Sequence, residues 1–304
     1  MGGISEAFNN LRISRKLALG FGLMILLLLI TSFAGYQGLS RSDKGFDQYR
    51  ELARDSNLAG RLQANLLFMQ TEFKSYLITN KPEALNRYRI RLQAMKDFLR
   101  QAQQEIQKPE RASLIQEILP LIDEYEQAAN KITEQIEIRN NRVGQVLSIK
   151  GPEMRKIITE LRQHGYQNEL SGLSHYAGNL QESLILGRFY LLKYFDTQDI
   201  SDYQISRKQL SDILDNDLIK VRQLELSNQH KAELQRFSQL RQEYLIAMDE
   251  TFNALSQQQQ LATNALEKAG PAIAANIEKV KLSVIADQDL LGPDLQNSNE
   301  EAKQ

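Results

Sequence analysis

Cysteine and tryptophan are absent from the 304-residue sequence, which also has only six prolines and three histidines. Without cysteine there is no disulfide, thiol nucleophile or cysteine-ligated zinc, so packing alone must hold the fold. His164, His175 and His230 are scattered and form no convincing i, i+4 pair with a carboxylate for binding a metal. A glycine-rich phosphate loop, a nucleophile elbow and a haem motif are missing as well. We therefore expect no metal site, no cofactor and no enzyme activity.

A strong charge of one sign is also lacking. The sequence has 37 basic and 38 acidic residues, which gives a formal net charge of −1. Residues 1–40 hold three Lys/Arg and one Glu, so the remainder is close to −3 and evenly mixed. No basic patch therefore indicates nucleic acid as a partner.

One long apolar run is present near the N-terminus, and no charged residue occurs from Leu17 to Ser40. About 20 apolar residues in a helix cross a bilayer core of about 30 Å. A cleaved secretory signal would have about 7–15 apolar residues and an A-x-A-like site, which "FAGYQG" matches poorly. We predict an uncleaved transmembrane helix over 17–40. Arg12, Arg15 and Lys16 place residues 1–16 in the cytoplasm, and residue 41 onward outside the inner membrane.

Beyond residue 40 the apolar residues recur every three or four positions, as on one face of a helix. The first such stripe contains Leu58, Leu62, Asn65, Met69, Phe73 and Tyr76. Pro82 and Pro109 indicate new helix starts, and Ser227 is a candidate N-cap. The sequence predicts an all-α fold with six helices, two long and four short, over 36–79, 83–107, 111–164, 167–196, 199–226 and 228–290.

The chain also repeats itself. "LQANLLFMQTEFKSYLIT" from Leu62 aligns with "LQESLILGRFYLLKYFDT" from Leu180 at an offset of 118 residues. "KGPEMRKII" and "AGPAIAANI" align at an offset of 119. We infer an internal duplication and interpret each Gly-Pro pair as a local bend in a continuous helix. Two pairs of short helices along two long ones predict two stacked four-helix bundles over 41–290. The polar tail 291–304 would precede a second membrane helix.

Candidate ligand residues are polar side chains on or beside the core stripes, with arginine as the fork that binds carboxylates. Counting residues along the helices places some of them at a similar distance from the membrane, on the order of 40 Å. This proximal set comprises Arg54, Arg61, Asn65, Arg139 and Thr263. The distal set comprises Arg188, Tyr190, Tyr194, Arg207 and Tyr244. Alternatively, Arg54 and Arg61 are solvated charges, Asn65 fixes helix register, and the tyrosines are core residues.

This organisation resembles the N-terminal part of a bacterial methyl-accepting chemotaxis receptor with a helical bimodular sensor domain. The "ISRKLALGFGLMILLLLI" entry and the "SVIADQDLLGP" exit are similar to those of such receptors. The resemblance implies small organic acids as ligands, including citric-acid-cycle intermediates and acetate. It also implies homodimers formed through the first and last helices. Family members continue into a second membrane helix, a HAMP linker and a methyl-accepting hairpin, so we expect a sensor fragment or a receptor-derived protein without its own output.

The function expected from the sequence is the ligand-binding sensor region of a transmembrane chemoreceptor. It would detect small organic acids outside the inner membrane and transmit a helix displacement through the membrane. Two alternatives remain open at this point. One is the sensor of a membrane histidine kinase, which shares such modules, and the other is an anchored helical stalk that binds a protein partner.

Overall fold

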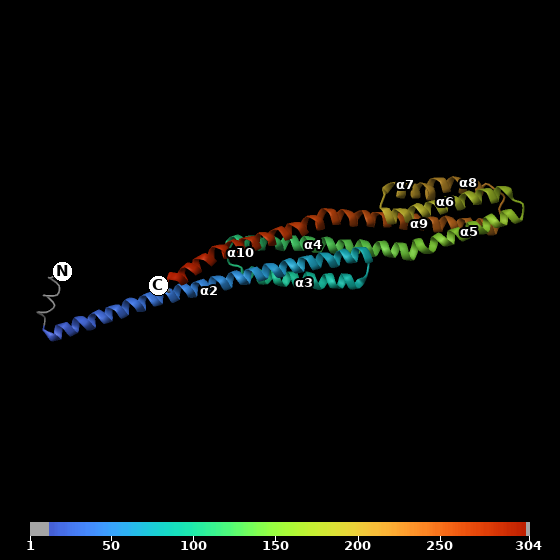
Figure 1. Ribbon diagram of the computed structural model, residues 1–304. Coiled ribbons are helices and arrows are strands. Elements are labelled where there is room, and N and C mark those ends of the chain that lie inside the picture. The colour runs from blue at the N-terminus through green and yellow to red at the C-terminus, as the bar shows by residue number, and fades with distance from the viewer. Residues whose placement is uncertain (1–11, 302–304) are drawn as a thin grey trace. The chain divides into compact units, whose positions relative to one another are not determined.

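The computed structural model describes residues 12–301, without the side chains at 15, 294, 295, 297–299 and 301. Helices occupy nearly all of this range, and it contains no strand, which confirms the all-α prediction (Figure 1). The helices are α2 (Ile13–Thr79), α3 (Pro82–Glu105), α4 (Pro109–Asn141), α5 (Ser148–Gln167), α6 (Ser171–Thr197), α7 (Ile200–Lys208), α8 (Leu214–Arg222), α9 (Asn228–Leu261) and α10 (Glu267–Glu301). Three π-helical segments link them: η1 (Arg142–Leu147), η2 (Gln209–Ile213) and η3 (Ala262–Leu266).

These elements join into six helical runs that follow the predicted helices closely, with three corrections. The predicted membrane helix and first sensor helix form one continuous helix, α2. The fifth run ends at Arg222 rather than 226. The sixth run continues to Glu301, so the predicted polar tail is helical up to that residue, through Pro293. Residues 1–11 and 302–304, at the ends of the predicted cytoplasmic segment and tail, lie outside the described residues.

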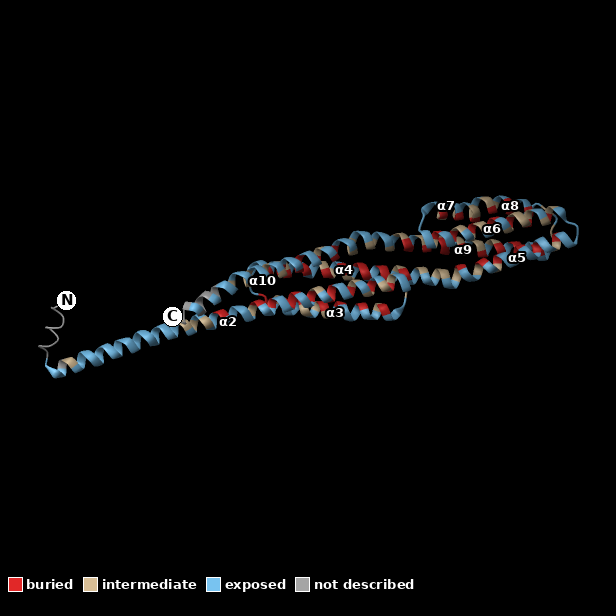
Figure 2. Cartoon of the chain, in the orientation of Figure 1, coloured by how far each residue is buried: buried red, intermediate tan, exposed pale blue. Residues whose placement is uncertain are grey.

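The N-terminal part of α2 is long and apolar enough to cross a membrane. Its large side chains, such as Leu23, Leu28 and Phe33, are all more than half exposed. Figure 2 shows this part of α2 almost entirely in the colour of exposed residues, with no other described helix beside it. An exposed apolar helix of this length is stable in lipid but not in water. This segment agrees with the predicted membrane helix.

The chain divides into two compact units, each with its own core. Unit 1 consists of Met1–Ile122 and Gly270–Gln304, and unit 2 of Asp123–Ala269. The core of unit 1 is built by α2, α3, the first part of α4, and α10, whose inward residues include Phe73, Met95, Ile118 and Ile277. Each of these is at most 1% exposed. Four helices thus bury one apolar stripe each, as in a four-helix bundle.

Unit 2 is a second bundle, formed by the remainder of α4 with η1 and α5, then α6, then α7 to α8, and α9. Its core includes Leu161, Leu184, Leu214 and Phe237, one from each helical run, and all four are fully buried. The π segment η2 interrupts the third of these runs. Arg241 on α9 donates hydrogen bonds to two carbonyl oxygens of this segment, at Leu210 (3.3 Å) and Ser211 (3.4 Å).

The helix ends support the inferred duplication. α2 ends at Thr79 and α6 at Thr197, and the next residue, Asn80 or Gln198, is left-handed in both cases with φ of 53° or 55°. Each of these residues donates its backbone N–H to a tyrosine carbonyl oxygen, at Tyr76 or Tyr194, over 2.8 Å. The same cap geometry therefore recurs at the offset of 118 residues.

The Gly-Pro pairs lie inside continuous helices and recur with the same surroundings. Pro152 lies five residues after the end of η1, and Pro271 lies five residues after the end of η3. A proline ring crowds the carbonyl four residues earlier, which belongs to Ser148 or Glu267, the first residue beyond each π segment. In both helices a π turn, which is wider than an α turn, directly precedes the crowded carbonyl. The extra width accommodates the proline ring, and both helices continue through their prolines.

Candidate functional site

A buried arginine marks one end of unit 1. Arg111 is 1% exposed and lies in the first turn of α4, which begins at Pro109. It shares the inward face of that helix with Ile115, Ile118 and Ile122, at spacings of four, three and four residues. A guanidinium removed from water in this way needs hydrogen-bond partners and an opposite charge.

Arg111 finds its partners on two other helices. Its Nη1 donates to Oδ2 of Asp55 on α2 over 3.0 Å. Its Nε and Nη2 donate to the hydroxyl (3.1 Å) and the carbonyl oxygen (3.0 Å) of Ser283 on α10. Nη2 also contacts the carboxylate of Asp287, one turn further along α10. One side chain therefore fastens α4 to both α2 and α10.

Lys108 extends this cluster toward solvent. Its ammonium donates to both carboxylate oxygens of Asp287, over 2.8 and 2.9 Å. The hydrogen bond from Lys108, assisted by the charge of Arg111, lowers the pKa of Asp287. Burial raises the pKa of Asp55, with the Glu51 carboxylate acting in the same direction and Arg111 opposing it. Among the described residues, Oδ1 of Asp55 has no hydrogen-bond partner.

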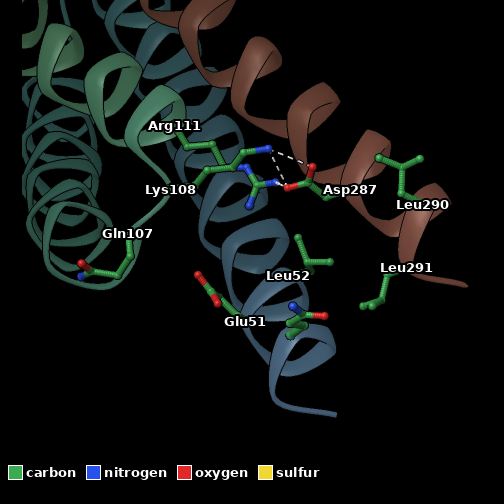
Figure 3. Close-up of a pocket in the computed structure, with 9 residues that line it drawn as sticks. Glu51, Leu52, Gln107, Lys108, Arg111, Asp287, Leu290 and Leu291 are labelled. Atoms are coloured by element: carbon green, nitrogen blue, oxygen red, sulfur yellow. Dashed lines mark hydrogen bonds and ion pairs between the residues drawn. The ribbon is translucent and has the colours of Figure 1, made fainter. Parts of the chain in front are cut away.

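A pocket of about 500 Å³ opens beside this cluster (Figure 3). Its charged wall consists of Lys108, Arg111 and Asp287, with Glu51 on α2. Its remaining lining residues are Gln48, Leu52, Gln107, Leu290 and Leu291. Figure 3 shows Lys108 and Arg111 converging on Asp287, while Glu51 projects from α2 without an interaction to the other residues drawn. The pocket thus combines charged groups with leucine side chains.

Asp55, Arg111 and Asp287 are not among the site residues predicted from the sequence. Two of them nevertheless carry a signal in the sequence. Arg111 continues the inward isoleucine stripe of its helix, and Asp55 lies three residues before Leu58 on the stripe of α2. A charged residue in the core phase of a helix indicates a buried pair. Neither residue reveals its partner, because the two lie 56 positions apart.

Three of the predicted proximal residues lie in unit 1 and are already engaged there. Arg54 donates to the carbonyl oxygen of Glu105 over 2.9 Å and pairs with its carboxylate over 3.4 Å. The exposed Arg61 has its guanidinium carbon 5.2 Å from the ring centroid of Phe98, a cation–π contact. Asn65 is 8% exposed, and its amide donates to the carbonyl oxygen of Arg61 over 2.9 Å within the same helix.

The other two proximal residues belong to unit 2. The guanidinium of Arg139, half-buried on α4, donates to Oδ1 of Asn140 over 3.2 and 2.9 Å. Thr263 is exposed on the π segment η3. The five proximal residues are therefore divided between the two units. A single pocket formed by all of them stays a prediction.

The distal residues all lie in unit 2, and Arg188 has the most distinctive surroundings. It is half-buried on α6. A Cβ added to Gly151 of α5 would lie only 2.6 Å from its Nε, so the guanidinium occupies the space that the glycine leaves open. Its guanidinium also hydrogen-bonds the Tyr244 hydroxyl on α9 and opposes the rise that burial causes in the pKa of Tyr244. Within residues 12–301, no carboxylate pairs with Arg188.

The other distal residues are paired or packed. Arg207 pairs with Asp249 over 3.1 Å. Tyr194 is 3% exposed, and its ring centroid lies 5.6 Å from that of Phe252. Tyr190 lies near the surface, with the ammonium of Lys193 5.8 Å from its ring centroid. Arg188 and Tyr244 are thus the two distal candidates that the structure brings together.

A comparison with known families identifies the class of protein. Residues 10–176 match the family described as the four helix bundle sensory module for signal transduction. The chain belongs to this family. It is a sensory module of the methyl-accepting chemotaxis receptor class, as the sequence resemblance implied. No curated protein matches the chain closely enough to add a second comparison.

The matched residues of this chemoreceptor module comprise α2, with its apolar N-terminal part, through α5, and the beginning of α6. The helix α10, which completes the bundle of unit 1, lies beyond the match, as do most of α6 and all of α7 to α9. Membership therefore shows a membrane-associated sensor for signal transduction. The family description names no ligand and no binding residue.

Proposed function

We propose that the chain is the sensor region of a chemoreceptor that binds small organic acids outside the inner membrane. Arg12 and Lys16 before the membrane helix favour a cytoplasmic N-terminus, so the two bundles would face the extracytoplasmic side. Family membership supports the sensory role. The carboxylate specificity rests on one observation, the surroundings of Arg188.

Arg188 is suited to a carboxylate because its fork is held in place but not neutralised. Gly151 leaves room for the guanidinium beside α5, and Tyr244 holds it from α9. Arginine binds carboxylates through two parallel hydrogen bonds, and this pairing is stronger when the site is partly shielded from water. In the described chain, Arg188 differs in this respect from Arg207, whose charge is taken by Asp249.

Binding at Arg188 provides a physical route for a signal. A carboxylate there would meet α6 through Arg188 and α9 through Tyr244, so it would favour one packing of these helices. From Asn228 to Glu301, α9, η3 and α10 form a continuous helical run. Packed helices shift by about 1–2 Å in such transitions. A displacement of α9 would pass along this run. The π turn η3 within it is a point where the rotation of one part of the helix relative to the other can change.

Thermal unfolding of the full chain in lipid nanodiscs, with a panel of small mono- and dicarboxylic acids, tests this proposal. A ligand at 100 times its dissociation constant adds about 2.7 kcal/mol of stability. We expect Arg188→Ala to abolish the shift. Arg188→Lys should raise the dissociation constant at least tenfold, because lysine lacks the planar fork, and the added stability should fall to about 1.4 kcal/mol or less. Arg155→Ala, at an exposed arginine of α5, is the matched control and should keep it.

Absence of any shift across the panel would contradict the organic-acid assignment and favour the helical stalk. A shift that persists in Arg188→Ala but is lost in Arg61→Ala or Arg139→Ala would move the site to the proximal set.

A further inference from the structure

The two carboxylates that line the pocket of unit 1 differ in their partners. Arg111 lies between Asp55 and Asp287, and Lys108 donates to both oxygens of Asp287. These two cations and two carboxylates neutralise one another. The carboxylate of Glu51 then remains, and no hydrogen bond or ion pair reaches it within the part of the chain that the structure describes. Glu51 is therefore the carboxylate of the pocket wall that no cation of the described chain engages.

A second feature is the apolar wall of the same pocket. Leu52 of α2 is 7% exposed, whereas Leu290 of α10 is 71% exposed, and Leu291 lies beside it. In Figure 3 Leu290 and Leu291 lie on the α10 side of the pocket, far from Gln107, and Leu52 lies between these two leucines and Gln107. Covering such side chains is favourable at roughly 25 cal/mol per Å² of apolar surface. At about 500 Å³ the pocket also has the size of a typical small-molecule site.

We propose that this pocket binds a small organic ammonium that carries an apolar group. The ammonium would lie against the Glu51 carboxylate, and the apolar group would cover Leu52, Leu290 and Leu291. A carboxylate ligand fits poorly here, because Lys108 and Arg111 are already paired and Glu51 would repel it. A hydrated metal ion gains nothing from the leucine wall.

The occupant would touch α2 through Glu51 and Leu52, and α10 through Leu290 and Leu291. It would therefore add to the link between these two helices that Arg111 already makes through Asp55 and Ser283. This inference goes beyond the carboxylate site at Arg188 and does not depend on it. The two ligands differ in charge, so they can be titrated separately.

Isothermal titration calorimetry of the full chain in nanodiscs, with empty nanodiscs as the blank, tests the proposal. Three probes share one skeleton and differ in charge: 2-phenylethylammonium, 3-phenylpropionate and 2-phenylethanol. We expect the ammonium to bind at least tenfold more tightly than either of the other two. Glu51→Gln should lower its affinity at least tenfold, because the glutamine keeps the shape of the side chain and removes the charge.

Three variants complete the experiment. Glu137→Gln, at an exposed carboxylate of α4, should leave ammonium binding unchanged. Leu291→Asn keeps Glu51 and should weaken binding by removing apolar surface, which provides a second test if Glu51→Gln folds poorly. Arg188→Ala should keep ammonium binding, which separates this site from the carboxylate site. The proposal is overturned if the ammonium does not bind, if 3-phenylpropionate binds better, or if Glu51→Gln binds it undiminished.

Discussion

At the scale of single residues, the Asp55–Arg111 pair is the most constrained feature of unit 1. Both side chains are at most 1% exposed, and their hydrogen bond of 3.0 Å joins α2 to α4. A buried ion pair contributes little net stability, because desolvation of both groups offsets their attraction. Removing one partner is costly, however, because the other charge then stays buried alone. The pair therefore specifies which helices meet more than it raises the stability of the bundle.

Comparing a single variant with a double variant tests this interpretation. Arg111→Ala should destabilise the full chain by about 3–5 kcal/mol, because it leaves the Asp55 carboxylate buried without its cation. Asp55→Leu combined with Arg111→Met should recover most of that loss, since apolar groups then fill the same space. Differential scanning calorimetry of the chain in detergent measures both variants. A double variant as unstable as Arg111→Ala would show that the loss has another origin.

At the scale of elements, the repeat explains why two bundles can be built from one pattern. The left-handed caps at Asn80 and Gln198, and the proline-associated π segments η1 and η3, recur at nearly one offset. The two repeats differ at some of the positions where one helix packs against another. Gly187 on α6 aligns with Met69 on α2 at the offset of 118. Gly187 lies against Leu210 of η2, and its carbonyl oxygen accepts a hydrogen bond of 2.7 Å from Ser206.

Two glycines of α6 offer a matched pair of substitutions. A Cβ at Gly187 would overlap the side chain of Leu210, whereas nothing in the described chain lies within 4 Å of a Cβ at Gly178. We expect Gly187→Ala to destabilise unit 2 by about 1–3 kcal/mol through overpacking. Gly178→Ala should stabilise it by about 0.5–1 kcal/mol, because alanine favours the helix. Thermal unfolding followed by circular dichroism compares the two, and equal shifts would contradict the close packing of α6 on η2.

At the scale of the whole molecule, α2 presents a face that its own chain leaves uncovered. Phe46, Ala53, Gly60 and Leu67 are exposed and recur every seven residues, with Phe46 at 66% and Leu67 at 57%. A sustained seven-residue repeat with apolar side chains is the pattern of a coiled-coil seam. The small residues in the middle allow two helices to approach closely. We propose that a second copy of the chain covers this face.

The homodimer expected from the family resemblance can then be tested on this face. Leu67→Glu should raise the dimer dissociation constant at least tenfold, about 1.4 kcal/mol, because it buries a charge in the seam. Ile90→Glu on α3 is the control, because Ile90 has the size of Leu67 and a similar exposure of 58%. It should leave association unchanged. Analytical ultracentrifugation of the full chain in detergent measures both. A monomeric wild type, or equal effects of the two variants, would contradict this interface.

The sequence by itself determined the helices, the membrane segment and the repeat. The signals used were local: proline positions, N-caps and an apolar period of three to four residues. Helix boundaries are also set locally, by hydrogen bonds and side-chain burial within one segment of the chain. This is why five of the six predicted runs end within about four residues of the observed ends, a margin usual for helix boundaries. The same helical period placed Arg188 and Tyr244 in one candidate set.

Only the tertiary structure decided which polar residues are already paired. Arg54 and Arg61 looked as available for a ligand as Arg188, but Glu105 and Phe98 engage them. Arg111 meets Asp55 and Asp287 across 56 and 176 positions of sequence. A helical period states which residues face inward, but it does not state which helix lies opposite. That choice depends on the joint packing of all four stripes.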